Sequence, residues 1–236
     1  FSLPIEEHEA LVLRTVEEMH QRGDWITPYF NAEPRLNKPP LPYWLTGLVA
    51  WADGSLARVQ VWHGRLVVVL AGLAWLYLVI GLGRRLFDNH VGSLAGLILA
   101  TSWGFFTYTH NARPEMLYTA LCTGIIMAMV VIWQAEQRKR PSWQASFALW
   151  VLVGLATLAK GPHLPLLLIV AGVAFLKQEG WAWRTLAQRF NPLLGLALAA
   201  SLTVPWWWAL DRSLGGDGLA GSQLSGTLFG LDFWGP

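Results

Sequence analysis

The chain has 236 residues, of which 54% are hydrophobic and only 14% are charged, whereas a soluble domain is usually about 25% charged. This composition excludes a disordered chain and a soluble enzyme, and the net charge of +2 is too small for electrostatic binding of a nucleic acid. Cys122 is the single cysteine, which excludes an intrachain disulfide and a multi-cysteine metal site, so the composition predicts a membrane protein.

Residues 1–65 hold much of the charge and precede the long apolar segments. Helical spacing of apolar residues predicts a helix over 6–21, which Gly23 is expected to end. A proline-punctuated loop follows over 31–40. Residues 41–51 then predict a short apolar helix, which is too short to span a membrane and is expected to lie at its surface.

Six apolar segments follow, and they predict an all-α polytopic membrane protein with about six transmembrane helices within residues 66–210. The segments are 66–82, 91–109, 116–134, 145–159, 164–176 and 193–210. The fourth and fifth are short and need tilting to span. Residues 211–236 predict the start of a further outer loop, and a chain that starts at Phe1 and stops at Pro236 is expected to be a fragment. Glycines in or next to the first two segments are expected to ease helix packing: Gly81, Gly83, Gly92 and Gly96.

Basic residues predict which ends of the apolar segments face the cytoplasm. One set of alternate loops contains Arg84, Arg85, Arg138, Lys139, Arg140, Lys177, Arg184 and Arg189, whereas the other set contains Arg113, Lys160 and Arg212. Because cytoplasmic loops carry the excess of Lys and Arg, the first set is predicted to be cytoplasmic. Residues 1–65 then lie on the outer side. The tryptophans 206–208 fall at the outer end of the last segment, where an aromatic belt is expected.

Ionisable residues gather at the predicted outer ends of the apolar segments. The two short outer loops carry Arg113, Glu115 and Lys160, and the first loop adds Glu9 and Lys38 on the same side. Ionisable groups near a membrane are costly and mark functional sites. Because Lys and Arg bind phosphate and a carboxylate can serve as general base, these residues predict a site for an anionic lipid head group.

Each of these residues also has a structural interpretation. Glu9 is typical of a solvated helix face, and Lys38 is typical of a side chain that anchors a loop at the membrane interface. Arg113 and Glu115, two residues apart, predict an ion pair within one loop. Lys160, followed by Gly-Pro, is typical of the charge that ends a helix. The residue types alone leave both interpretations open.

Two long stretches and three short motifs resemble a known family. The stretch from Glu9 to Pro28 contains Gly23-Asp-Trp25, and the stretch 30–45 contains Lys38-Pro-Pro40. The short motifs are Gly83-Arg-Arg-Leu-Phe87, Ala112-Arg-Pro-Glu-Met116 and Leu158-Ala-Lys-Gly-Pro162. In this order, and over nearly the whole chain, they resemble the C-type (GT-C) membrane glycosyltransferases. The resemblance is greatest to the branch of lipid A aminoarabinose transferases and protein O-mannosyltransferases.

The resemblance implies a fold with one transmembrane helix before Phe1, several after Pro236 and interfacial helices in the first outer loop. It implies a glycosyltransferase that takes a sugar from a polyprenyl-phosphate donor at the extracytoplasmic, periplasmic side of the inner (plasma) membrane. The expected transfer inverts the anomeric centre. The acceptor is left open among lipid A, a protein, a polysaccharide and another lipid. The sequence contains no Gly-rich phosphate loop, as expected for a donor that arrives through the membrane.

The resemblance also assigns candidate acids and bases. The family usually has Asp-Glu at the start of its first outer helix, and counting back from Gly23-Asp-Trp25 places His8 and Glu9 there. Glu9 is therefore the first candidate for the catalytic base, with Glu7 and His8 in reserve, although a lone histidine is more typical of a structural residue. Glu115 matches the second acidic position, usually Asp, and keeps the charge on a longer side chain.

Basic and aromatic residues of the matching motifs are the expected contacts of the substrate. They are Lys38, Arg113, Lys160, Tyr43 and Arg35. The family often has Glu before the lysine of its Lys-Pro motif, but this chain has Asn37, so no metal ligands are assigned and a divalent metal ion is left as an alternative.

Two other functions compete with glycosyl transfer. A polytopic transporter or lipid flippase would also have charged loops, but it is expected to carry ionisable residues near the centres of its spans, where this chain has almost none. A non-catalytic family member that only binds lipid or a partner is the second alternative, because His8 stands at the usual Asp position.

Overall fold

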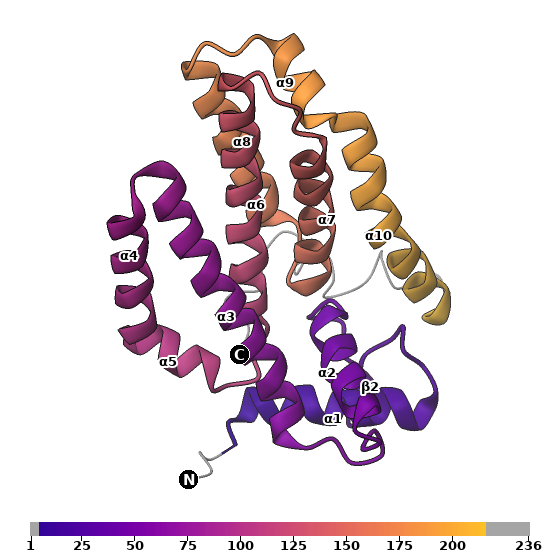
Figure 1. The fold of residues 1–236 in the computed structure, drawn as a ribbon. Helices are drawn as coiled ribbons and strands as arrows, with labels where there is room; N and C mark the ends of the chain where they lie inside the picture. Colours follow the sequence, from indigo (N-terminus) through magenta and orange to yellow (C-terminus); the bar gives the residue numbers. More distant parts are fainter. Residues whose placement is uncertain (1–4, 216–236) are drawn as a thin grey trace.

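The computed structural model describes residues 5–215, which are helical apart from turns, loops and one short hairpin (Figure 1). In chain order the elements are α1 (Glu7–Arg22), β1 (Tyr29–Phe30), β2 (Glu33–Pro34), α2 (Leu41–Ala52), α3 (Val61–Leu86), α4 (Asn89–Thr101), α5 (Trp103–Thr109), α6 (Pro114–Gln137), α7 (Trp143–Ala159), α8 (His163–Gln178), α9 (Trp183–Phe190) and α10 (Pro192–Ser213). The two strands pair antiparallel, with Tyr29 opposite Pro34 and Phe30 opposite Glu33.

The first helix ends where the sequence predicts. Gly23 adopts a left-handed conformation with φ of 65°, and the N–H groups of Gly23 and Asp24 donate to carbonyls of the last turn of α1. One face of α1 is apolar because Val16 and Met19 share it, and both are fully buried. They pack in one cluster with Tyr43 of α2, so α1 and α2 share a small core of their own.

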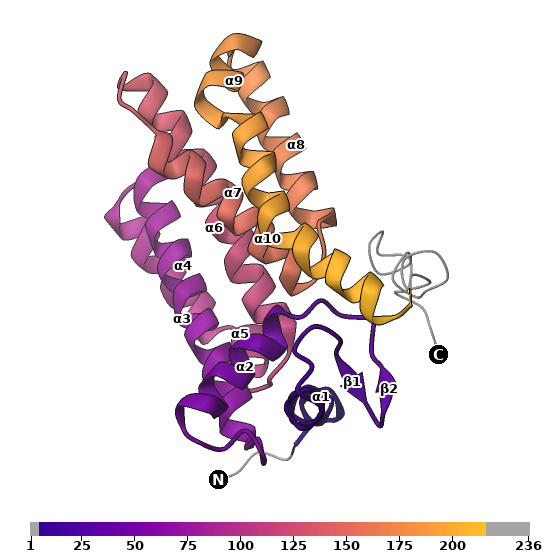
Figure 2. The same ribbon diagram turned by 90° about the vertical axis from the view of Figure 1, so that its right-hand side faces the viewer.

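The first helix, the hairpin and α2 gather at one end of the helical bundle (Figures 1 and 2). Figure 2 shows α1 almost end-on, with the hairpin beside it. The indole N–H of Trp206, in α10, donates to the carbonyl of Ile26 at 2.8 Å, so the last described helix is tied to this end as well. The chain therefore brings its first and last described segments together next to the starts of α3, α6 and α8.

The bundle is built by neighbouring pairs: α3 packs against α4 and α6, and α7 packs against α6 and α10. Its core lies between α6 and α7, where Ile125, Ile132 and Leu149 are fully buried. A Cβ added at Gly83 would come within 2.6 Å of the Cα of Gly92, so these glycines let α3 and α4 approach closely. The predicted role of these glycines in helix packing is confirmed.

Each predicted apolar segment lies on a helix, and the second lies on two. Within residues 5–215, three helical stretches are long and apolar enough to cross a membrane: Val61–Leu86, Pro114–Gln137 and Trp183–Ser213. The last stretch takes α9 and α10 together. A fourth span results if Asn89–Ala100 and Trp103–Thr109, which meet at a bend of 62°, count as one. Because α7 and α8 are shorter apolar helices, the division into an outer loop over 1–65, about six spans over 66–210 and a loop over 211–236 stays a prediction. Most of that last loop lies outside the described residues.

Candidate functional site

Glu9, which is buried, and Arg65, which is partly buried, form an ion pair between α1 and α3. The guanidinium Nε and Nη2 of Arg65 donate to Glu9 Oε1 and Oε2, each at 2.9 Å. The side chain of Glu9 is 1% exposed and that of Arg65 is 21% exposed. Glu9 Oε1 also accepts the backbone N–H of Ala112 at 3.3 Å. Glu9 is therefore not on a solvated helix face, and both of its carboxylate oxygens are occupied.

The same contact fixes the loop that begins α6. Ala112 is 4% exposed and lies two residues before Pro114, the first residue of α6. Proline at this position suits a helix start because its missing N–H would have no partner within the helix. Glu115 follows in the first turn, where the helix dipole favours a negative charge. Glu9 thus helps to position Glu115 through the backbone between them.

Glu115 meets Lys160 at the junction of α6, α7 and α8. The ammonium Nζ of Lys160 donates to Glu115 Oε1 at 3.1 Å, while Glu115 Oε2 is buried and accepts no hydrogen bond within residues 5–215. Lys160 follows the last residue of α7, where the helix dipole favours a positive charge. The hydroxyl of Tyr118, one turn along α6 from Glu115, donates to the carbonyl of Gly161 at 3.0 Å. This bond holds the loop of Lys160 against α6.

Lys38 completes a cluster of charges around Glu115. It lies in the loop between the hairpin and α2, close enough for the charges of Glu115, Lys160 and Arg35 to affect it. Burial lowers the pKa of Lys38 below its ordinary value; Glu115 opposes this shift, whereas Lys160 and Arg35 add to it. The structure therefore brings together three residues that lie far apart in the sequence, with two cations next to one carboxylate.

Arg35 and Tyr43 border this cluster on the side of the first loop. The guanidinium Nε of Arg35 donates to the Tyr43 hydroxyl at 3.4 Å, and Tyr43 is buried. Arg35 also lies over the ring of Phe30, 5.8 Å from its centroid. These contacts orient the guanidinium beside Lys38, as expected for a residue that helps to bind an anion.

Arg113 pairs with Glu6 and not with Glu115. Its Nη2 donates to Glu6 Oε2 at 2.9 Å, and both side chains are partly exposed. The predicted ion pair within one loop is therefore wrong, because the start of α6 turns Glu115 toward Lys160. A hydrogen bond from the Asn111 side chain, helped by the charge of Arg113, lowers the pKa of Glu6. The pair ties the start of α1 to the α5–α6 loop.

His8 does not join the cluster. It lies on the exposed side of α1, next to the buried Glu9, and within residues 5–215 the structure gives it no hydrogen bond or ion pair. Adjacent residues of a helix point about 100° apart, which explains why one is exposed when the other is buried.

Two residues of this region were not predicted from the sequence. Arg65, the partner of Glu9, is 56 residues away along the chain, so no local spacing connects them. One feature of the sequence could have identified Arg65: it lies near the start of the first long apolar segment, where a charge without a partner would be costly. Glu18, the second buried carboxylate of α1, has no distinguishing signal in the sequence.

The arrangement can bind an anion and accept a proton. Lys38 and Lys160 supply two positive charges for a phosphate, and Glu115 supplies a carboxylate close to both. Among residues 5–215, no group of three or more His, Cys, Asp or Glu side chains is placed to hold a metal ion.

Comparison with known sequences gives three findings. The sequence model of a family described as dolichyl-phosphate-mannose-protein mannosyltransferase matches residues 37–208. An uncharacterized protein of Aquifex aeolicus is 29% identical over 160 residues, which cover 66% of this chain and 30% of that protein. The undecaprenyl phosphate-alpha-4-amino-4-deoxy-L-arabinose arabinosyl transferase of Pseudomonas aeruginosa is 28% identical over 198 residues, which cover 80% and 33%. The chain spans about a third of the length of these two relatives.

Solved structures give a matching fold. The crystal structure of ArnT from Cupriavidus metallidurans in the apo state is similar with a TM-score of 0.78 and 22% identity, over 98% of this chain and 40% of that chain. The same protein bound to undecaprenyl phosphate is similar with a TM-score of 0.77 and 23% identity. This likeness confirms the predicted fold class, an all-α polytopic membrane protein.

Proposed function

Because the chain belongs to the dolichyl-phosphate-mannose-protein mannosyltransferase family, we propose that the full-length protein is a glycosyltransferase that uses a polyprenyl-phosphate sugar. The acceptor belongs to the cell envelope: lipid A, a protein or a polysaccharide. Two facts about relatives support the donor class. One relative is named an undecaprenyl phosphate-aminoarabinose transferase, and the similar solved structure contains undecaprenyl phosphate.

The observation that carries this proposal is the cluster of Lys38, Lys160 and Glu115 at one end of the bundle. The two lysines come from the loops before α2 and before α8, and the carboxylate comes from the first turn of α6. A phosphate linked to a lipid reaches such a place from the side, through the membrane, so the site needs no nucleotide-binding loop.

In the proposed reaction, Lys38, Lys160 and Arg35 hold the phosphate of the donor. The acceptor oxygen forms a bond to the anomeric carbon while the bond from that carbon to the phosphate oxygen breaks. The electron pair leaves with the phosphate, whose growing negative charge the cations stabilise. Glu115 takes the proton of the acceptor through its buried Oε2. Attack opposite the leaving group inverts the anomeric centre.

Glu9 has a different role in this proposal. Both of its oxygens are occupied by Arg65, and one also accepts the N–H of Ala112. We assign it the task of positioning the start of α6, so Glu115 replaces it as the first candidate for the base. His8 is exposed and stays a reserve, and Arg113 acts at the border of the site through its pair with Glu6.

The donor cations give the first testable expectation. Lys38→Ala and Lys160→Ala should each weaken use of the donor by roughly 10- to 150-fold, since each loses a charge-assisted contact worth roughly 1.5–3 kcal/mol. The measurement is kcat/KM for a polyprenyl-phosphate sugar. Arg138→Ala is the control, because Arg138 is an exposed cation that follows α6 at its far end from Glu115. Unchanged kinetics in both lysine variants would contradict the assignment and would support the structural interpretation of both residues.

The pH profile adds a second readout for Lys38. Because burial lowers its pKa, the cationic form is lost at a lower pH than in an exposed lysine, and donor affinity should fall as the pH rises through that lowered pKa. A guanidinium stays charged throughout. Lys38→Arg should therefore move this alkaline loss of affinity to higher pH, and an unmoved profile would contradict the assignment.

We further propose that the cluster faces the periplasmic side of the inner membrane, with residues 1–65 on that side. Single cysteines in a Cys122→Ala background test this topology. A membrane-impermeant maleimide added outside the inner membrane should label Arg58→Cys, which is in the first loop, and should spare Arg138→Cys, which follows α6. Both positions are exposed on the protein. The reverse labelling pattern would overturn the orientation.

A transfer assay with the purified full-length protein decides among the candidate functions. The expected result is transfer from a radiolabelled polyprenyl-phosphate sugar to an envelope extract, with release of the polyprenyl phosphate. Binding of the donor without transfer would support the non-catalytic alternative. Movement of intact donor across the bilayer of proteoliposomes, without cleavage, would support a flippase.

A further inference from the structure

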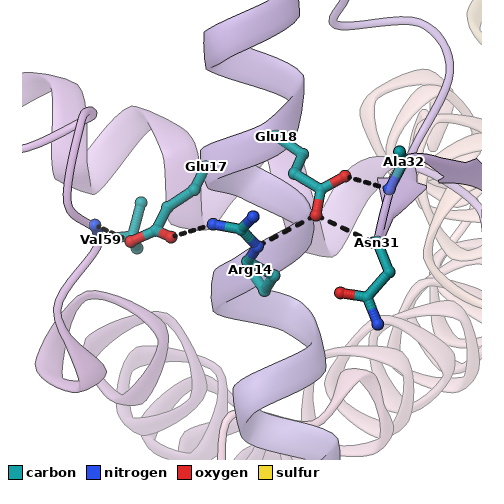
Figure 3. A network of polar contacts seen from close by, with 6 residues as sticks. All are labelled: Arg14, Glu17, Glu18, Asn31, Ala32 and Val59. Atoms are coloured by element: carbon teal, nitrogen blue, oxygen red, sulfur yellow. Dashed lines mark hydrogen bonds and ion pairs between the residues drawn. The ribbon is translucent and has the colours of Figure 1, made fainter.

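Glu18 holds the tip of the β1–β2 hairpin from the neighbouring helix. Its Oε1 accepts the backbone N–H of Asn31 at 2.9 Å, and its Oε2 accepts the N–H of Ala32 at 3.0 Å (Figure 3). The Nε of Arg14, one turn earlier in α1, pairs with Oε1 at 3.0 Å. Glu18 is 4% exposed. The two oxygens of this buried carboxylate thus each accept one of two consecutive amide N–H groups of the turn.

The turn needs such support because its conformation is costly. Asn31 and Ala32 have φ of 53° and 67°, so both central residues of the two-residue loop are left-handed. Asparagine tolerates this region, but alanine has no polar side chain to compensate for the crowding of its Cβ. Consecutive amide N–H groups of such a turn make a concave site for an anion, which the Glu18 carboxylate occupies.

The charge of Glu18 is maintained despite its burial. Burial alone would raise its pKa, but the amides of Ala32 and Asn31 and the charge of Arg14 outweigh this, and the pKa lies below its ordinary value. The carboxylate is therefore ionised at neutral pH and stays a strong acceptor for both amides.

The adjacent Glu17 makes a parallel contact on another side of α1. Its Oε1 accepts the N–H of Val59 at 2.9 Å, and Arg14 reaches its Oε2 at 3.4 Å (Figure 3). Val59 lies just before α3, the helix that carries Arg65. Of these two carboxylates, Glu17 supports the connection to α3 and Glu18 supports the hairpin, so the two contacts can be separated by mutation.

The contact of Glu18 bears on the proposed phosphate site, because the segment that follows the hairpin carries residues of that site. The Arg35 N–H donates to the Pro28 carbonyl at 2.7 Å and closes the open end of the hairpin. Arg35 begins the segment that carries Lys38, and both residues belong to the proposed phosphate site. We propose that Glu18 is a positioning residue for this site: by fixing the turn, it sets where Arg35 and Lys38 meet the donor phosphate. This inference rests on the proposed function.

The rest of the hairpin has anchors of its own. The indole N–H of Trp44 donates to the Trp25 carbonyl at 2.7 Å, and the guanidinium of Arg22 lies over the ring of Tyr29, 4.2 Å from its centroid. Loss of the Glu18 contact should therefore free the turn without detaching the hairpin or unfolding α1.

The test is Glu18→Gln in the full-length protein. A carboxamide has one carbonyl oxygen, so one of the two turn amides loses its acceptor, and the pair with Arg14 is lost. The donor KM should rise about tenfold, while the acceptor KM changes less than about twofold, because only the phosphate-binding segment is released. Glu33→Gln is the matched control: it removes a carboxylate from the same hairpin, where Glu33 is exposed. Its donor KM should equal that of the unmodified protein.

A rescue variant separates positioning from general instability. Glycine adopts a left-handed conformation without cost, so Ala32→Gly removes the need for support at that residue. Glu18→Gln/Ala32→Gly should recover at least half of the lost donor affinity, measured as the logarithm of KM. Equal losses for donor and acceptor, or a double variant as impaired as the single one, would overturn the proposal.

Hydrogen exchange keeps this test independent of the proposed function. The amides of Asn31 and Ala32 should exchange at least tenfold faster in Glu18→Gln than in Glu33→Gln, while the amides of α1 remain protected. If the unmodified protein transfers no sugar but exchange behaves this way, the proposed function fails and the contact of Glu18 with the turn stands. If the unmodified protein transfers sugar and the turn amides exchange at an unchanged rate, the positioning role fails alone.

Discussion

Glu115→Gln in the full-length protein is expected to reduce kcat by about 100- to 10,000-fold, the scale of a lost general base, while the fold is kept. The carboxamide has nearly the same shape and can still accept the bond from Lys160, but it cannot take a proton from the acceptor. Glu115 Oε2 is buried with no hydrogen bond from residues 5–215, so it is the oxygen left for that task. The measurement is turnover at saturating donor and acceptor.

Two variants sharpen this prediction. Glu115→Asp keeps the charge and should retain far more activity than Glu115→Gln, since the carboxylate is still present at the start of α6. Glu179→Gln is the control, because Glu179 is an exposed carboxylate that follows α8 at its far end from Lys160. Full turnover in Glu115→Gln would remove Glu115 from the chemistry and leave Glu9 or His8 as the base.

Glu9→Ala is expected to destabilise the protein by roughly 3–5 kcal/mol, because it removes the buried carboxylate that compensates the charge of the partly buried Arg65 guanidinium. The value should fall toward the lower end, since 21% of the Arg65 side chain is exposed. The measurement is the free energy of unfolding in detergent by chemical denaturation. Glu6→Ala removes the partly exposed ion pair with Arg113 at the residue that precedes the same helix, and it should leave that free energy nearly unchanged.

A double change distinguishes stability from catalysis at this position. Glu9→Leu combined with Arg65→Leu replaces the buried pair by apolar side chains and should restore most of the lost stability. If Glu9→Gln keeps full stability but abolishes turnover, Glu9 is the base, as the sequence alone predicts. His8→Gln should change neither property, because His8 is exposed next to the buried Glu9.

The fold could be predicted from the sequence because its signals are local. The apolar segments locate the helices, and Gly23 ends α1 as expected. The bend of 62° between α4 and α5 was not predicted, because the apolar run over 91–109 continues through it. The family resemblance, drawn from the Gly-Asp-Trp and Lys-Pro-Pro motifs, is confirmed by the match over residues 37–208.

The site could be predicted only in part. Alternation of loops between the two sides of a membrane was enough to group Lys38, Glu115 and Lys160, and the structure brings these three together. Their individual partners depend on tertiary packing, which sequence spacing does not report. Nearness in sequence therefore paired Arg113 with Glu115, whereas the fold gives each of them a partner from another segment.

The contacts of α1 also have a consequence for biosynthesis. This helix is synthesised before its partners, because Glu9 is completed by Arg65, 56 residues later, and by the backbone of Ala112, 103 residues later. Until those segments have been synthesised, the carboxylate of Glu9 has neither of these partners, and water must hydrate it. The complete docking of α1 must therefore wait for α6, so the site is assembled only after the helices that follow α1 are in place.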